Sequence, residues 1–259
     1  MARFLLTAST SPLAVAMAHH LVAEGHEIVA LARAPERATE LPTGVALLEV
    51  DLADPERVDA AELPDVDGIM HLAGILGHRA DPVPYGWPEQ PTVDRVWATN
   101  VLGPLRLVRR LLPRLPDGAA VSLISGSVHR RASLPDAAFR STGLRASAQA
   151  ATAKVAWTRA LARRRPDLVA TTFCPGRVAG NLHRGLPWPL SALGGLVGRG
   201  AAPGSSVAPW LASLLLGGHP SGTYVERGER RAPAAHTDDE GLQDAVWDRV
   251  ASWAATEAS

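Results

Sequence analysis

The turn after the first apolar run of the chain has residue types suited to binding an anion. Ser11 is a favourable N-cap, and Pro12 suits the first position of the helix that follows. The N-terminus of a helix attracts negative charge through its free backbone N–H groups and its dipole, although Pro12 removes one of those donors. We therefore expect an anion site at this turn.

Lys154 is the second residue whose type indicates chemistry. It is the only lysine among 26 basic residues, so the others are all arginine. In such a chain an isolated lysine indicates a specific contact, because a compact ammonium is not reproduced by a planar guanidinium. A sugar hydroxyl would provide that contact, and the alternative is an ordinary charge on a helix surface.

A third group of polar residues follows the apolar run at 120–124. Ser125 can hydrogen-bond a substrate carbonyl, with Ser127 as the alternative if the strand ends later. A strand-end serine that bonds its own backbone is an equally good interpretation. His129, Arg130 and Arg131 come next and could stabilise an oxyanion, although a solvated turn is the more common role of such a segment.

Alternating strands and helices position these residues. Strands are predicted at Arg3–Ala8, Glu27–Ala32, Val45–Val50, Gly68–Leu72, Ala120–Ser125, Leu168–Cys174 and Thr223–Glu226. Helices are predicted at Pro12–Glu24, Pro55–Ala61, Val93–Leu112, Ala146–Arg164, Ser206–Leu216 and Asp238–Ala255. Apolar strands separated by helices predict an α/β fold, a doubly wound, Rossmann-type parallel sheet of about seven strands with helices on both faces. We expect residues 1–259 to form a single domain.

Three long segments interrupt this alternation, at residues 74–91, 126–145 and 176–205. Each follows the carboxyl end of a predicted strand, which is where open α/β sheets bind ligands. Long irregular segments in a compact domain are usually functional or disordered. They are predicted to form the walls and lid of one substrate pocket.

The first turn also carries a family resemblance. The segment Thr7 to Ala14, TASTSPLA, resembles the fingerprints TGxxxGxG and TGxxGxxG of the short-chain dehydrogenase/reductase superfamily. Every glycine is replaced, but mostly by small residues, so the approach of a pyrophosphate is hindered without being blocked. The cofactor contacts that the resemblance implies in this segment are Thr7, Ser9, Thr10, Ser11, Pro12 and Leu13.

The resemblance continues along nearly the whole chain. Arg33 stands where NADP-preferring members carry an arginine for the 2′-phosphate, which a guanidinium binds in bidentate fashion. The segment 71–74, HLAG, is similar to the family's NNAG, and 175–178, PGRV, to the PGxV that packs against the nicotinamide. The resemblance implies cofactor contacts at Arg33, Asp51, Leu52, Ala73, Gly74, Lys154, Pro175, Gly176 and Val178, and catalytic roles for Ser125, Lys154 and Asn100.

One departure from the family pattern concerns the chemistry itself. Family members carry Tyr-x-x-x-Lys on one helical face, and the phenol protonates the substrate carbonyl. Here Lys154 keeps its place and Ala150 replaces the tyrosine. The chain has only two tyrosines, Tyr85 and Tyr224, and neither has the required spacing. The chain therefore resembles an atypical branch of the superfamily, the angucyclinone ketoreductases of the simocyclinone type.

That resemblance implies an NADPH/NADP+-dependent ketoreductase for a carbonyl of an aromatic polyketide-type natural product. Without the tyrosine, an acidic phenol of the substrate would supply the proton internally. Trp87, Trp188 and Leu190 in the long segments would suit a large aromatic substrate, and ordinary loop packing is the alternative.

Two other functions remain open from the sequence. The lost glycines favour a cofactor-independent isomerase or cyclase, whereas the retained Arg33, Asp51, Asn100 and Lys154 oppose it. A non-catalytic binding protein on the same fold would explain the loss of both the glycines and the tyrosine, since fold does not fix function. It would not explain the retained PGxV-like segment.

Composition limits the possible partners. The 26 basic and 26 acidic residues balance, which argues against nucleic acid or an anionic membrane as a partner. A single cysteine, Cys174, excludes an internal disulfide and a cysteine-based metal site, and we expect no metal. The sequence has no run of about 20 apolar residues, so we expect a cytoplasmic protein. The sequence does not decide the oligomeric state, which is either a monomer or a homodimer.

Overall fold

Short apolar runs form one central sheet in the computed structural model, which describes residues 1–87, 89–135, 137–180 and 200–252. The strand order is β10-β9-β8-β7-β4-β1-β2-β3, with every neighbouring pair parallel except β9 and β10. The strands are β1 (Arg3–Leu6), β2 (Glu27–Ala32), β3 (Ala46–Glu49), β4 (Gly68–His71), β7 (Ala120–Ile124), β8 (Val169–Cys174), β9 (Thr223–Glu226) and β10 (Glu229–Arg231).

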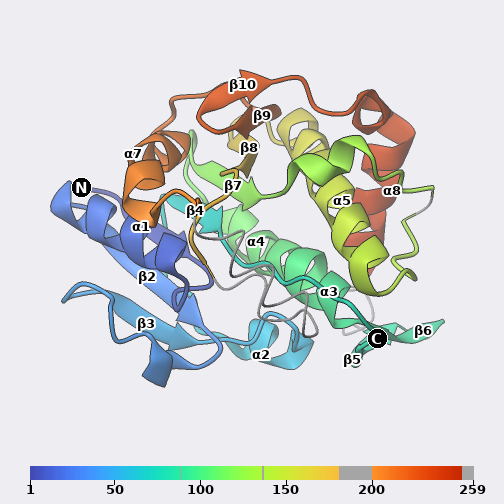
Figure 1. The fold of residues 1–259 in the computed structure, drawn as a ribbon, viewed down its shortest axis with the longest axis horizontal. Coiled ribbons are helices and arrows are strands. Elements are labelled where there is room, and N and C mark those ends of the chain that lie inside the picture. The colour runs from blue at the N-terminus through green and yellow to red at the C-terminus, as the bar shows by residue number, and fades with distance from the viewer. Residues whose placement is uncertain (88, 136, 181–199, 253–259) are drawn as a thin grey trace.

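Helices cover both faces of this sheet (Figure 1). They are α1 (Pro12–Ala23), α2 (Pro55–Ala60), α3 (Arg95–Trp97), α4 (Gly103–Leu111), α5 (Gly143–Arg164), α7 (Gly204–Leu215) and α8 (Glu240–Ser252), and a π-helical segment, Ala98–Leu102, joins α3 to α4. Short 3-10 turns form at Pro35–Arg37, Leu112–Arg114, Ser127–Arg130 and Ala235–Asp238. Within the described ranges, no helix has both the length and the apolar character needed to cross a lipid bilayer.

The strand period of two divides the core into two layers. Phe4 and Leu6 of β1 point into the layer beneath α1 and α7, whereas Leu5 between them joins the larger layer beneath α4 and α5. The predicted Rossmann-type parallel sheet with helices on both faces is therefore confirmed. All seven predicted strands form, with ends that differ by up to two residues.

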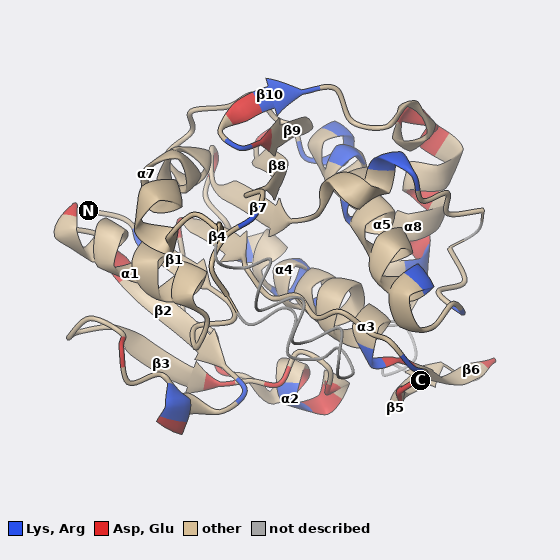
Figure 2. Ribbon diagram, in the orientation of Figure 1, with Lys and Arg blue, Asp and Glu red and all other residues tan. Residues whose placement is uncertain are grey.

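The last helix packs on the outside of α5 rather than on the sheet. Trp157 of α5 stacks on Trp247 of α8 at 5.4 Å between ring centroids. The basic end of α5 lies beside acidic residues of α8 (Figure 2), and both Arg163 and Arg164 pair with Asp244, at 2.5 and 2.8 Å. These contacts fix the outer side of the helix whose inner side carries Lys154.

The structure has three strands that the sequence analysis missed. β10 forms because Arg227 and Gly228 adopt φ of 53° and 85°, the left-handed pair that closes a two-residue hairpin. The prediction of an irregular segment at 74–91 was wrong in part, because β5 (Pro82–Trp87) and β6 (Gln90–Asp94) pair as an antiparallel hairpin. Of the predicted lid at 176–205, residues 181–199 lie outside the described part of the chain.

The predicted helix at 93–112 also begins late. Asp94 ends β6 and caps α3 instead, accepting a hydrogen bond from the Val96 N–H at 2.9 Å. The same carboxylate accepts from the N–H groups of Asp81 at 3.2 Å and Gly143 at 3.4 Å. One buried side chain therefore ties the hairpin to the starts of two helices.

Gly103 sets how closely α4 approaches the end of β3. A Cβ atom at this position would overlap the carbonyl oxygen of Leu52, a backbone atom that cannot move aside cheaply. We predict that Gly103→Ala lowers the unfolding free energy by about 3 kcal/mol, the upper end for overpacking. The melting temperature should fall by about 6 to 12 °C.

Gly126→Ala is the matched control, because its new Cβ would make ordinary van der Waals contact with Val128 alone, 3.5 Å from Cγ1 and 4.0 Å from the backbone N. Thermal unfolding followed by circular dichroism compares the two variants. Equal stability of the Gly103 variant and the wild type would contradict this packing.

Candidate active site

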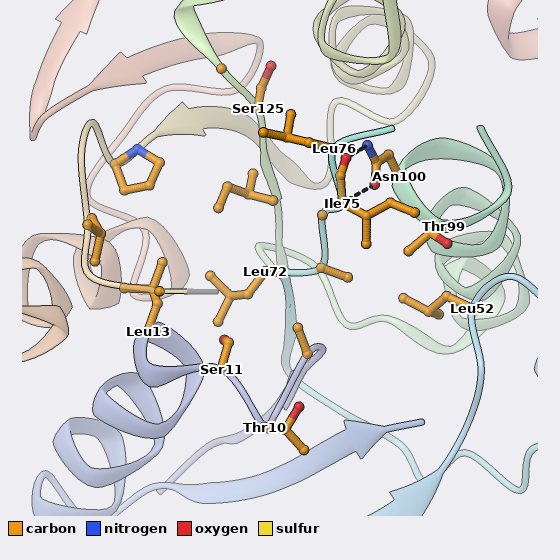
Figure 3. Close-up of a pocket in the computed structure, with 18 of the residues that line it drawn as sticks. Thr10, Ser11, Leu13, Leu52, Leu72, Ile75, Leu76, Thr99, Asn100 and Ser125 are labelled. Atoms are coloured by element: carbon orange, nitrogen blue, oxygen red, sulfur yellow. Dashed lines mark hydrogen bonds between the residues drawn. The ribbon is translucent and has the colours of Figure 1, made fainter. Parts of the chain in front are cut away.

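A cavity of about 520 Å³ lies at the carboxyl ends of the parallel strands, a volume typical of a small-molecule site. Figure 3 shows its walls, with Ser11 and Leu13 on one side and Asn100 and Ser125 on another. The walls include these residues predicted from the sequence: Thr10, Ser11, Pro12, Leu13, Arg33, Asp51, Leu52, Ala73, Gly74, Asn100, Ser125, Lys154, Pro175, Gly176 and Val178. Residues far apart in the sequence therefore meet in one place.

Two of the predicted contacts, Thr7 and Ser9, do not line the cavity. Thr7 is fully buried, and its Oγ1 accepts hydrogen bonds from the N–H groups of Leu72 at 3.0 Å and Ala73 at 3.1 Å. Ser9 is also buried and donates to the Leu6 carbonyl at 3.3 Å. Both hydroxyls hold the backbone of the turn, so the structure places them in its frame and not at its surface.

The first turn keeps the shape of a glycine turn without a glycine. Ala8 has φ of 58°, the left-handed region in which a Cβ atom crowds the backbone. The Ser11 N–H donates to the Ala8 carbonyl at 2.8 Å, and Ser11 then caps α1 by accepting from the Ala14 N–H at 3.2 Å. The hydroxyls of Thr10 and Ser11 and the N–H of Leu13 remain as donors for an anion.

Arg33 and Asp51 lie at the end of the cavity formed by β2 and β3. Arg33 is exposed and has no hydrogen-bond or ion-pair partner among the residues that the structure describes. Asp51 is held in a local turn, since its Oδ1 accepts from the Ala53 N–H at 2.9 Å. This end therefore offers a free guanidinium and an oriented carboxylate.

Lys154 lies at the other end, across β1 and β4, and its side chain is almost completely enclosed. Burial lowers the pKa of Lys154 to about 8. Neighbouring His71 adds no second positive charge, because burial and the Lys154 charge lower its pKa to about 3. In the unfolded chain the lysine has its ordinary pKa of 10.5, so between pH 8 and 10.5 the unfolded state binds more protons than the folded state. The free energy of unfolding therefore rises with pH over this range.

Ser125 and Asn100 are both engaged with the backbone. The Ser125 hydroxyl donates to the Ala151 carbonyl of α5 at 3.1 Å. The Asn100 amide closes a two-way clamp on Ile75, accepting from its N–H at 2.8 Å and donating to its carbonyl at 2.9 Å (Figure 3). Asn100 lies in the π-helical segment, a local widening that is common at functional sites. It positions the loop after β4.

Comparisons with known proteins decide the family. A family model described as short chain dehydrogenase matches residues 3–134. The chain belongs to the short-chain dehydrogenase family. A curated relative from Streptomyces sp. (strain C5), "Putative daunorubicin C-13 ketoreductase DnrU", is 26% identical over 96% of this chain and 91% of its own length.

Solved structures share the fold. An uncharacterized protein of Mycobacterium paratuberculosis superimposes with a TM-score of 0.77 at 19% identity, covering 98% of this chain and 93% of that one. A short chain dehydrogenase from Burkholderia cenocepacia in complex with NADP has a TM-score of 0.66 at 20% identity, with 87% and 95% covered. The chain is thus an oxidoreductase of a family whose fold binds a nicotinamide cofactor.

The cavity has three features that fit such a dinucleotide. The turn at Ala8 has a left-handed backbone, and the N-terminus of α1 faces the cavity. The buried Lys154 ammonium lies at the far end and has no acceptor among the described residues. Gly176, with φ of 78°, turns the chain along the same wall. Within the described ranges, no group of three or more histidine, cysteine or acidic residues is close enough to hold a metal ion.

In this short-chain dehydrogenase, Ala150, which the sequence resemblance predicts at the tyrosine position, contributes nothing to the cavity wall. Ala150 is buried in the core beneath α5 and does not line the cavity. Ser147, Ala151 and Lys154 face it instead, at the i, i+4, i+7 spacing of one helix face. Ser147 was missed by the sequence analysis, although this spacing from Lys154 was the available signal.

Several residues that the sequence offered as alternative site residues do not line the cavity. Ser127 is exposed and does not line the cavity, which favours Ser125. The His129 ring is buried against Tyr224, with Nδ1 2.8 Å from the Gly126 carbonyl, so it supports the loop beside Ser125. Trp87 packs under the Arg249 guanidinium, 3.6 Å from its ring centre, instead of lining the cavity. Trp188 and Leu190 lie outside the described residues.

The strain at Ala8 gives a direct test of the turn. A non-glycine residue in the left-handed region costs about 1–2 kcal/mol, whereas glycine costs about 0.5–1 kcal/mol in backbone entropy. We predict that Ala8→Gly leaves the unfolding free energy unchanged or raises it by up to about 1 kcal/mol. Ala14→Gly, in the first turn of α1, should lower it by about 1 kcal/mol. Equal losses in the two variants would show that Ala8 is not strained.

Proposed function

We propose that this short-chain dehydrogenase is a cytoplasmic, NADPH-dependent ketoreductase that reduces a carbonyl of an aromatic polyketide-type natural product. The observation that carries the proposal is the pair of cations, Arg33 and Lys154, at the two ends of one cavity. Neither has a hydrogen-bond or ion-pair partner within the described ranges. A dinucleotide with a phosphate at one end and a ribose near the other would provide partners for both.

The preference for NADPH rests on Arg33. A free, exposed guanidinium beside the end of β2 suits a phosphate monoester, which it can bind through two parallel hydrogen bonds. Asp51 lies one strand further along the same wall. The substrate class rests on the relative named as a ketoreductase for daunorubicin, matched over almost the whole chain.

The source of the proton distinguishes this protein from tyrosine-bearing relatives. Tyr85 lies in the β5–β6 hairpin and Tyr224 in β9, both are buried, and neither lines the cavity. Burial raises the pKa of each phenol. The Ser125 proton is engaged by the Ala151 carbonyl. We therefore assign the proton to a phenol of the substrate itself, placed beside the ketone.

The division of labour follows. When bound, the reduced nicotinamide supplies a hydride to the carbonyl carbon. The chain encloses the reacting groups beside Lys154 and Ser125 and holds them in place, which can replace much of what a lost general acid contributes, a factor of about 100 to 10,000. Asn100 keeps the wall at Ile75 in position through its amide clamp.

Titration of the purified protein with NADPH and NADH tests the cofactor. We expect NADPH to bind more tightly, and Arg33→Ala to weaken NADPH binding by about tenfold or more while NADH binding changes less than twofold, because only NADPH carries the 2′-phosphate. Isothermal calorimetry measures both constants. Equal effects on the two coenzymes would remove the NADPH assignment, and silence toward both would favour a cofactor-independent isomerase or cyclase, or a binding protein.

Ser125→Ala tests the serine separately. Because its hydroxyl donates to the backbone of α5, its loss should lower turnover of an aromatic hydroxyketone by about tenfold or less. Steady-state kinetics measures the change, with Ser127→Ala as the control at a nearby exposed serine. Complete loss of activity in the Ser125 variant would mean that a conventional catalytic serine operates here.

A further inference from the structure

Lys154 is a buried cation that the described part of the protein does not neutralise. The residue is 6% exposed and lines the cavity. No carboxylate pairs with it among the described residues, and the His71 ring of β4, whose pKa burial and the Lys154 charge lower to about 3, is neutral over the working pH range. An uncompensated buried charge is costly, so a ligand that brings an acceptor or a negative charge to Lys154 would stabilise it.

Asp51, the carboxylate among the described residues of the cavity wall, is too far along the sheet to neutralise Lys154. It follows β3, on the far side of β4 and β1 from the strands that α5 covers. Ribose hydroxyls can accept hydrogen bonds from the ammonium, but they carry no charge. The ammonium has three N–H donors, so it can hold a hydroxyl and still meet an anionic oxygen.

Nothing on α5 separates Lys154 from a substrate. The residues of the same helix face, Ser147 and Ala151, are small, and Ala150 carries no phenol. The Ser147 hydroxyl oxygen accepts a hydrogen bond from the Gly77 N–H at 3.1 Å. A flat, electron-rich ring can therefore approach the ammonium directly along this face of α5.

We propose that Lys154 is the counter-ion of the substrate's phenolate, and that the substrate is an aromatic ketone with a phenol ortho or peri to the reduced carbonyl. The inference rests on the proposed function and deepens it. The carbonyl carbon gains the hydride and the carbonyl oxygen gains the phenol proton, which leaves one negative charge on the phenol oxygen. The Lys154 ammonium balances that charge until solvent returns a proton.

The test uses a coloured phenol that reports its own ionisation. 1-Hydroxyanthraquinone has a hydroxyl peri to a carbonyl, and its absorbance changes when the phenol ionises. Bound to the purified full chain, with and without NADP+, the phenol should ionise about one to two pH units below the free dye, because an opposite charge within a few ångströms favours the anion. Lys154→Met should abolish this difference, and Lys154→Arg should retain part of it.

Two controls separate charge from packing. Measured without NADP+, Arg33→Met also removes one cavity cation, but at the far end, and should leave the pH at which the bound phenol ionises as in the wild type. 1-Methoxyanthraquinone has no ionisable proton, so its affinity should differ less than twofold between the wild type and Lys154→Met. Circular dichroism confirms that each variant is folded.

The proposal is overturned if the bound phenol titrates alike in the wild type and Lys154→Met, if the methoxy ligand loses affinity as much as the hydroxy ligand, or if neither dye binds. Failure of the proposed function has a different signature. If NADPH does not bind but Lys154 still lowers the pH at which the bound phenol ionises, the counter-ion role is supported and the reductase assignment is wrong.

Discussion

The Lys154 ammonium lies inside the protein at the carboxyl edge of a parallel sheet, with a pKa that burial lowers to about 8. Its position depends on much of the fold. The inner side of α5 faces the cavity because the outer side is fixed by α8, through the stacked Trp157 and Trp247 and the ion pairs to Asp244. A charge held without a carboxylate among the described residues makes the cavity a site for an electron-rich ligand.

The opposite side of the cavity is formed by a tight turn that contains no glycine. Ala8 adopts the left-handed backbone that glycine favours, and the Thr7 and Ser9 hydroxyls bond that turn to its neighbours. Strain at one residue is maintained by several hydrogen bonds around it. The turn of the family fold is thereby kept, and in the proposed function Ala150 alters only the source of the proton.

Much of this was predictable from local pattern. Apolar runs between helices predicted the parallel sheet, and the family resemblance predicted that Ser11, Arg33, Asp51 and Lys154 share one site, which the cavity brings together. The sequence could not show that Thr7 and Ser9 turn inward, since that depends on donors from β4, a distant strand. It also missed β10, because the run Glu226 to Arg231 is charged and only the φ angles of its central pair disclose a hairpin. The β5–β6 hairpin was hidden by its prolines, which usually mark loops.

The most direct test of the central claim, that a dinucleotide lodges between Ser11 and Lys154, is a crystal structure of the protein grown with saturating NADPH. The account predicts the pyrophosphate at the N-terminus of α1, the 2′-phosphate at Arg33 and the nicotinamide ribose within hydrogen-bond distance of Lys154 Nζ. Absence of the coenzyme from a fully open cavity, or a cavity closed by Leu13 and Leu72, would contradict it.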